Sequence, residues 1–275
     1  MAQDRFSVYP SISDDPASMA IAYPHGTFRG GIPRDYMVQP KDMFASPSGM
    51  PLIPESEWRD RFEEQEKEKS SLEHLYLGES LQSPKFVNLD QNGNGYCWAY
   101  STGHAIMFDR LRSNQPMVRL NPHATAAIIK SGRDEGGWSG LSAKFARETG
   151  YALEGTGPGQ WPLHSRNLKF DTPELRAEMG KYKVTEEWVD LALAPYDQNL
   201  TFAQLATCLL LNIPCQVDYN WWSHAICAIR LVWANNAWAV MIINSWKGWG
   251  RFGLGLLEGS RKVPDGSLAT RSTTA

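Results

Sequence analysis

The stretch Gln91-Asn-Gly-Asn-Gly-Tyr-Cys97-Trp-Ala-Tyr-Ser101 decides the fold, because it places a cysteine where a glycine-rich loop passes into a helix. The positive end of a helix and its unpaired N–H groups favour a thiolate over a thiol. The glycines let the backbone approach a ligand closely. Gln91 can donate a side-chain N–H to an oxyanion formed at a carbonyl that the sulfur attacks. The stretch therefore predicts a nucleophile, Cys97, whose thiol pKa lies well below its ordinary value of about 8.5.

A second set of residues, far downstream, supplies the base that such a nucleophile needs. Residues 225–232 and 238–243 are typical of buried strands, and Asn235-Asn236 between them is a turn signal. If the two strands form a hairpin, residue 224 returns beside residues 244–247. His224 and Asn244 are then neighbours, and a histidine oriented by an amide oxygen is the usual base for a cysteine nucleophile.

These motifs occur in one order: Gln91 and Cys97, then Gly136-Gly137-Trp138, then His224, then Asn244-Ser245-Trp246. In this order and spacing the chain resembles the papain-like cysteine peptidases over roughly residues 84–260. The resemblance implies an α+β fold with a helical subdomain, a strand-rich, barrel-like subdomain and the active site in the cleft between them. It also implies a peptide or protein substrate and no cofactor.

The resemblance also implies a role for each site residue. Gln91 is the oxyanion donor, Cys97 the nucleophile, His224 the general base and acid, and Asn244 the residue that orients His224; Gly136, Gly137 and Trp138 bind the substrate, and Trp246 shields the bond between Asn244 and His224 from water. Tyr96 departs from the family pattern, in which a small residue precedes the nucleophile, so we expect it to narrow the entrance to the cleft.

Composition excludes several classes of function. The chain has 275 residues and a formal net charge of −3, and no basic stripe interleaved with aromatic residues indicates nucleic-acid binding. No apolar run is long enough to span a membrane, and the first residues do not resemble a signal segment. Four cysteines without paired spacing favour a reducing compartment, so we expect a cytoplasmic or virion-associated protein. Cys208, Cys215, His224 and Cys227 match no common zinc pattern, so we expect no metal site.

The chain divides unevenly along its length. We expect a Pro-rich extended arm at 1–54, a charged helix and linker at 55–85, a helical subdomain with the nucleophile at 86–185, a strand-rich subdomain with the base at 186–262, and a tail at 263–275. Helices are expected over residues 55–69, 97–112, 122–131, 139–149 and 201–211, and a strand over 215–219.

Two classes of function fit these features. The first is a thiol hydrolase that cleaves peptide bonds, and the second is a structural or assembly protein, for example of a phage virion, that uses the arm as a tether to partner chains. The arm is either that tether or an inhibitory pro-segment that packs at Gly136-Gly137 and runs past Cys97. Its eight prolines and few apolar clusters favour the tether. We therefore expect residues 1–54 to leave the cleft open and to be ordered mainly by other chains.

Overall fold

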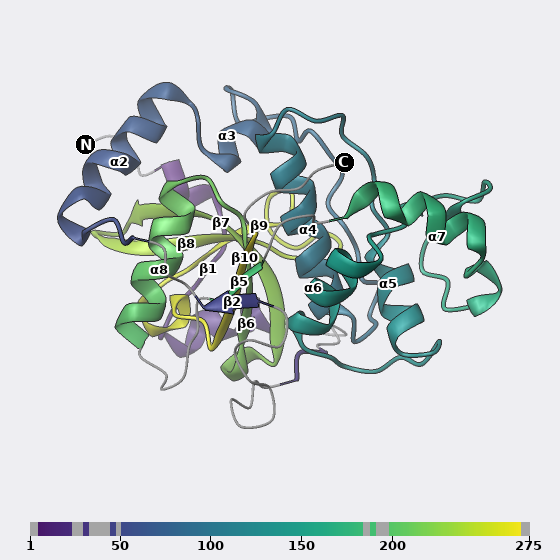
Figure 1. Ribbon diagram of the computed structural model, residues 1–275. Coiled ribbons are helices and arrows are strands. Elements are labelled where there is room, and N and C mark those ends of the chain that lie inside the picture. Colours follow the sequence, from purple (N-terminus) through teal and green to yellow (C-terminus); the bar gives the residue numbers. More distant parts are fainter. Residues whose placement is uncertain are drawn as a thin grey trace.

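A computed structural model describes residues 5–23, 30–32, 45–47, 51–183, 188–190 and 198–270. Its helices are α1 (Met19–Ala22), α2 (Glu55–Glu68), α3 (Leu72–Leu77), α4 (Cys97–Arg112), α5 (Pro122–Ile129), α6 (Ser139–Glu148), α7 (Pro173–Met179) and α8 (Gln198–Leu210). Its strands are β1 (Ser11–Ile12), β2 (Ala45–Pro47), β3 (Leu153–Glu154), β4 (Gln160–Trp161), β5 (Trp188–Asp190), β6 (Cys215–Tyr219), β7 (His224–Ala234), β8 (Ala237–Ile243), β9 (Leu254–Leu257) and β10 (Gly266–Thr270). Figure 1 shows α5, α6 and α7 on one side of α4 and the large sheet, with α8 and α2, on the other.

The large sheet has the order β1-β9-β8-β7-β6-β10-β5-β2 in the described part of the chain. The predicted hairpin is β7 and β8, which pair Ala234 with Ala237 and Cys227 with Ile243 across a bulge between Ala228 and Arg230. The turn residues Asn235 and Asn236 both have positive φ, as a tight two-residue hairpin turn requires. The hairpin prediction is confirmed, and it brings the start of β7 back beside the residues that follow β8.

Helix α4 lies inside the molecule, where it contacts β7, α5 and α6. Every residue from 97 to 110 is buried, so the helix is covered all round. Its polar side chains accordingly find partners, as where Thr102 Oγ1 donates to Gln216 Oε1 over 2.8 Å. The expected helix at 97–112 is confirmed, and α2, α5, α6 and α8 lie within a few residues of their predicted ranges. Among the described helices, none has the length and apolar character needed to cross a lipid bilayer.

Three segments differ from the sequence prediction. The segment that was expected to be a linker after the charged helix contains α3, which is capped by Ser71. This helix has only about one and a half turns, and so short a helix gives no periodic signal in the sequence. The arm is not separate from the domain, since β1 pairs with β9 and Phe6, Tyr9 and Ile12 are buried. The expected tail is also wrong at residues 266–270, which form β10 between β6 and β5.

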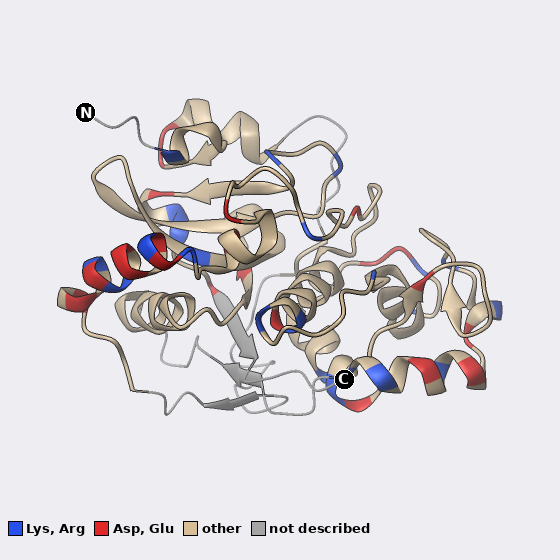
Figure 2. Ribbon diagram, turned by 90° about the horizontal axis from the view of Figure 1, so that it is seen from above, with Lys and Arg blue, Asp and Glu red and all other residues tan. Residues whose placement is uncertain are grey.

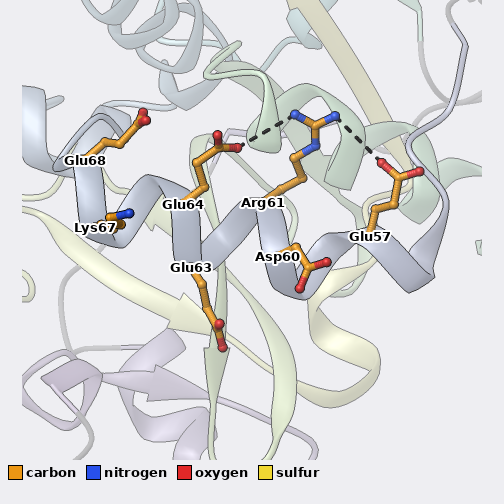
Figure 3. A pocket seen from close by; sticks show the side chains of 7 residues that line it. All are labelled: Glu57, Asp60, Arg61, Glu63, Glu64, Lys67 and Glu68. Carbon is orange, nitrogen blue, oxygen red and sulfur yellow. Dashed lines mark ion pairs between the residues drawn. The ribbon is translucent and has the colours of Figure 1, made fainter.

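Helix α2 has one apolar face and one charged face. Trp58 and Phe62 pack edge-on against Trp238, with ring centroids 5.9 and 6.1 Å apart. Charges of both signs alternate along the outer face (Figure 2). Figure 3 shows Arg61 between Glu57 and Glu64, at 3.7 and 3.8 Å. These long, exposed ion pairs indicate a solvated surface rather than a binding site.

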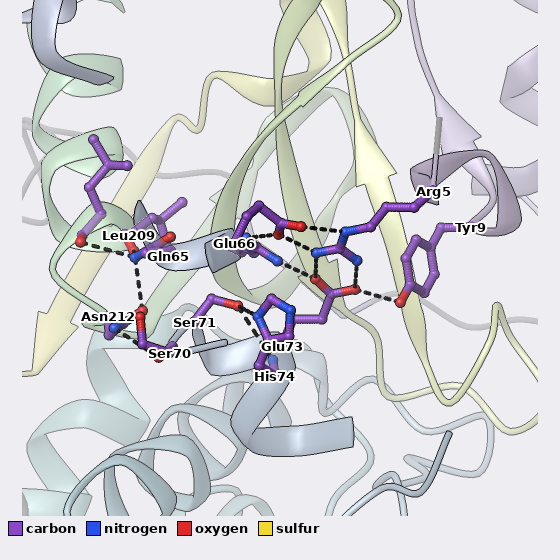
Figure 4. A network of polar contacts seen from close by, with 12 residues as sticks. Arg5, Tyr9, Gln65, Glu66, Ser70, Ser71, Glu73, His74, Leu209 and Asn212 are labelled. Carbon is purple, nitrogen blue, oxygen red and sulfur yellow. Dashed lines mark hydrogen bonds and ion pairs between the residues drawn. The ribbon is translucent and has the colours of Figure 1, made fainter. Parts of the chain in front are cut away.

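A partly buried cluster of four charges joins the N-terminal segment to the sheet (Figure 4). Arg5 donates to Glu66 at 2.8 Å and to Glu73 at 2.9 and 3.1 Å. Arg230 on β7 bonds both carboxylates, at 2.5 Å in the case of Glu73, and neither Arg230 nor Glu73 has an exposed side chain. Tyr9 adds a hydrogen bond to Glu73 at 2.6 Å. The guanidinium groups of Arg5 and Arg230 together balance the two carboxylates. This balance requires the N-terminal segment, because Arg5 belongs to it.

The cluster also fixes the charge of its members. Burial by itself would raise the pKa of Glu66, but the hydrogen bond from Arg5 and the charge of Arg230 outweigh it and lower that pKa to about 2. Burial and the charge of Arg230 lower the pKa of His74 to about 4, so this ring is neutral at pH 7. Because the carboxyl pKa of Glu66 falls on folding, its stabilising contribution is complete above its ordinary value of 4.5 and is lost as the pH falls towards 2.

Replacing Glu73 by Gln should destabilise the protein strongly, because Arg230 is then buried with one carboxylate instead of two. We expect a loss of about 3–5 kcal/mol in the free energy of unfolding, measured by urea denaturation at pH 7. Glu63→Gln is the matched control, since Glu63 pairs with Arg59 on the exposed face of α2 and should cost less than about 1 kcal/mol. Equal losses in the two variants would contradict a structural role for the cluster.

Candidate active site

Helix α4 and strand β7 meet at their N-terminal residues, Cys97 and His224. The loop before Cys97 is held by Asp134, which accepts a hydrogen bond from Gly95 N–H at 2.8 Å. The backbone N–H of Ala225, the residue after His224, is hydrogen-bonded to the sulfur of Cys97. The structure thus brings together the predicted nucleophile and the strand end that carries the predicted base.

His224 is held in one orientation. Its Nε2 lies 2.9 Å from Asn244 Oδ1, and because a carbonyl oxygen only accepts, Nε2 carries the proton of the neutral ring and Nδ1 is the basic nitrogen. Trp246 stacks on the ring with centroids 4.5 Å apart, and Trp222 packs edge-on at 4.8 Å. The predicted proximity of His224 and Asn244 is confirmed. Trp222, which the sequence indicated only as a core or wall residue, is a second aromatic cover over this histidine.

Gln91 is fully buried, and three hydrogen bonds fix its position. Its Oε1 accepts from Ser245 Oγ at 2.7 Å, and its Nε2 donates to Asn94 O at 2.7 Å. Its backbone N–H donates to Ser245 O at 2.9 Å. The Nε2 end of the amide therefore faces the loop that leads to Cys97.

Asn88 and His104 support Asn244 from behind, a contact that no pattern in the sequence indicates. Asn88 Nδ2 donates to the backbone oxygen of Asn244 at 2.8 Å, while Asn88 Oδ1 lies 3.0 Å from His104 Nε2. Burial lowers the pKa of His104 to about 3, so the ring is neutral and donates to Asn88. A methyl group at Gly253 would come within 2.3 Å of the Asn88 side chain, so only glycine fits there.

The N-terminal arm passes through the cleft at residues 30–32. Gly137 N–H donates to Gly30 O at 2.8 Å, and Ile32 N–H donates to Gly137 O at 2.9 Å, so the two segments form a parallel bridge. On the opposite wall, Gly31 N–H donates to Ser223 O at 3.0 Å. The expectation that the arm leaves the cleft open is therefore wrong. Without side chains at residues 30 and 31, the arm can lie against both walls.

Close contacts explain why both the arm and the cleft wall have glycine where they meet. A methyl group at Gly30 would lie 1.9 Å from Gly95 O, and one at Gly137 would lie 2.5 Å from the Trp98 ring. The predicted substrate-binding segment thus holds an extended chain, here the arm. Gly136 lies against the same arm carbonyl, and Trp138 is the N-cap of α6.

The closed cleft changes the chemistry of the thiol. Burial raises the pKa of Cys97 to about 12, and although the N–H groups of Ala225 and Gly30 oppose this rise, the charge of Asp218 adds to it. The prediction of a depressed pKa is wrong for this closed state, because a thiolate shielded from water is costly. Tyr96 does not narrow the entrance either, since its ring is buried and its hydroxyl donates to Arg133 O at 2.7 Å.

Other reactive side chains form no second centre in the part of the chain that the structure describes. All four cysteines are buried free thiols. Among the described residues, no group of three or more His, Cys, Asp or Glu side chains is arranged to hold a metal ion.

Comparison with known proteins identifies the fold. No family model matches the chain, and no curated protein matches it. Among solved structures, it is similar to xylellain, a cysteine protease from Xylella fastidiosa, with 17% identity, a TM-score of 0.57, and coverage of 91% of this chain and 97% of that one. It is also similar to proCathepsin B S9 from Trypanosoma congolense, with 13% identity, a TM-score of 0.57, and coverage of 92% and 89%. A structure from work on the mite allergens Blo t 1 and Der p 1 matches at 14% identity and a TM-score of 0.54, over 94% and 84%. The chain has the two-subdomain papain-like fold, as expected from the sequence.

Replacing Gly30 by Val should expel the arm from the cleft, because the rigid backbone at Gly95 cannot move aside. Cys97 should then react with iodoacetamide at pH 7 at least severalfold faster than in the wild type, as followed by peptide mapping. Gly180→Ala is the control, since a methyl group at Gly180 meets no neighbour within 4 Å. Unchanged alkylation of a folded Gly30→Val chain would show that residues 30–32 do not protect the thiol.

Proposed function

We propose that this protein is a thiol peptidase of the papain-like type, held inactive by its own N-terminal arm. The observation that carries the proposal is the hydrogen bond from His224 Nε2 to Asn244 Oδ1, covered by Trp246, at the strand end that meets Cys97. This bond selects the tautomer in which Nδ1 can accept the proton of a thiol.

The reaction follows from these roles. His224 Nδ1 takes the proton of Cys97, and the thiolate attacks the carbonyl carbon of a peptide bond. Gln91 Nε2 and the backbone N–H of Cys97, which has no intrahelical acceptor at the first residue of α4, stabilise the oxyanion. His224 then protonates the departing amine, and water hydrolyses the thioester with the same histidine as base.

The contacts of the arm support both substrate binding and latency. Gly137 bonds the arm through its N–H and its C=O, which is what a site for an extended peptide backbone does. At the thiol, however, the arm presents the N–H of Gly30, while its carbonyl is directed to Gly137. A nucleophile needs a carbonyl carbon, so the arm blocks the cleft without being cleaved there.

The alternative is an assembly protein that uses the arm as a tether to partner chains. No observation on the described residues favours it. Residues 5–23 make their contacts with this same chain, through the buried Phe6, strand β1 and the hydrogen bond from Trp222 Nε1 to Ala22 O at 2.8 Å. Two of the similar structures are a cysteine protease, xylellain, and a procathepsin, which agrees with a peptidase and a pro-segment.

Substitution of the oxyanion donor and of the orienting residue tests these roles. In the Gly30→Val chain, Gln91→Ala should lower kcat for a fluorogenic peptide by on the order of 10²-fold or more. Asn244→Ala should lower it less than Cys97→Ala, because nucleophile and base both remain.

The surface variant Gln82→Ala should keep full activity and serves as the matched control. Wild-type activity in Gln91→Ala would contradict its role as oxyanion donor. Residual activity in Cys97→Ala equal to that of the parent would contradict the whole proposal.

A further inference from the structure

Both backbone groups of Asn244 are held by hydrogen bonds, whereas its side chain is held by one. The backbone N–H donates to Gly253 O at 2.8 Å, and the backbone C=O accepts from Asn88 Nδ2 at 2.8 Å. In the side chain, Oδ1 accepts from His224 Nε2 at 2.9 Å, while the buried Nδ2 has no hydrogen-bond partner among the described residues. The backbone bonds therefore decide the direction in which Asn244 presents Oδ1 to the histidine.

His104 decides which end of the Asn88 amide faces Asn244. Asn88 Oδ1 lies 3.0 Å from His104 Nε2, and the ring is neutral because burial lowers its pKa to about 3. An amide oxygen only accepts, so Nε2 carries the proton of this ring and donates a hydrogen bond to Oδ1. With Oδ1 engaged in this way, Nδ2 is directed to the backbone oxygen of Asn244. If the amide turned over, two carbonyl oxygens would face each other.

His104 and Asn88 connect the helix of the nucleophile with the residue that orients the base. His104 lies about two turns after Cys97 on α4, so both side chains are on the same face of this helix. The histidine is buried, with 1% of its surface exposed. Contacts therefore run from α4 through His104 and Asn88 to Asn244, which directly follows β8 in the strand-rich half.

We infer that Asn88, held by His104, is a positioning residue for the base: it fixes the backbone of Asn244 and, through it, the orientation of the His224 ring. The inference rests on the proposed peptidase function. A rotation of the ring moves Nδ1 away from the line of proton transfer with Cys97. Such misplacement raises the barrier of the chemical step without weakening substrate binding, so we expect an effect on kcat rather than on KM.

A hydrogen bond that only stabilised the fold would give a different result. Its loss would lower the free energy of unfolding, but the molecules that remain folded would turn over substrate at the rate of the parent. The test therefore measures kcat, KM and the free energy of unfolding in the same variants.

The first variant is Asn88→Ala in the full-length Gly30→Val chain, assayed with a fluorogenic peptide that is selected from a mixed-sequence library on the Gly30→Val parent. We expect kcat to fall by on the order of tenfold and KM to stay within about twofold. Val87→Ala is the matched control, because Val87 directly precedes Asn88 and is 68% exposed. It should keep the kcat of the parent.

Two substitutions of His104 show whether its hydrogen bond to Asn88 is required. His104→Gln keeps an N–H that reaches Asn88 Oδ1, so it should retain most of kcat. His104→Leu keeps a buried side chain but has no donor, so it should lower kcat about as much as Asn88→Ala. Circular dichroism and urea denaturation give the folded fraction of each variant, to which kcat is normalised.

A double-mutant cycle identifies the residue through which Asn88 acts. If that residue is Asn244, Asn88→Ala should lower kcat no further in a chain that already carries Asn244→Ala. Two independent effects would multiply instead.

The other outcomes contradict the inference. An unchanged kcat in folded Asn88→Ala, a rise in KM as large as the fall in kcat, multiplied effects in the cycle, or equal kcat in His104→Gln and His104→Leu would overturn it, while the Gly30→Val parent still shows cleavage that Cys97→Ala abolishes. Unfolding of both Asn88→Ala and His104→Leu would make the pair a support of the fold alone and also overturns it. If the Gly30→Val parent cleaves no peptide of the library, the peptidase function itself is wrong, and the inference is wrong with it.

Discussion

The arrangement of this chain depends on the charge balance around the buried carboxylate of Glu73. Arg230 is completely enclosed on β7, and a buried guanidinium is tolerated only beside compensating carboxylates. Glu66 and Glu73 supply two negative charges, and Arg5 supplies the second positive charge. The N-terminal segment is therefore required for neutrality at the edge of the core. Because Arg230 lies on the strand that begins at His224, the same cluster joins the arm to the strand-rich half of the molecule.

Residues 30–32 of the arm connect the two walls of the cleft. Gly137 and Ser223 lie on opposite subdomains, and both hydrogen-bond the short run of residues 30–32. The close fit that makes this possible also removes water from Cys97. The helix start and nearby N–H groups favour a thiolate, but burial outweighs them and raises the pKa of Cys97 to about 12. In this arrangement the thiol of Cys97 is protonated and covered by the arm.

Most of the candidate site could be predicted from the sequence, because its geometry is set by local features. A glycine-rich loop before a largely apolar run predicts the start of α4 at Cys97. A two-residue turn fixes the register of β7 and β8, and this register brings His224 to Asn244. The supporting contacts of Asn88 and His104 could not be predicted, because a lone asparagine in a loop has no pattern that reveals its partner.

The sequence by itself therefore determined the nucleophile helix, the hairpin and the papain-like fold, since periodicity, turn residues and motif order act over short distances along the chain. Only the tertiary structure decided that the arm belongs to the sheet, that residues 266–270 form a strand and that Gly30 covers Cys97. A strand of two residues and a glycine pair leave no periodic signal, and their positions come from contacts with residues far away in the sequence. The pKa of the thiol was decided in the same way, because burial is a property of the packed molecule and not of the helix that bears the cysteine.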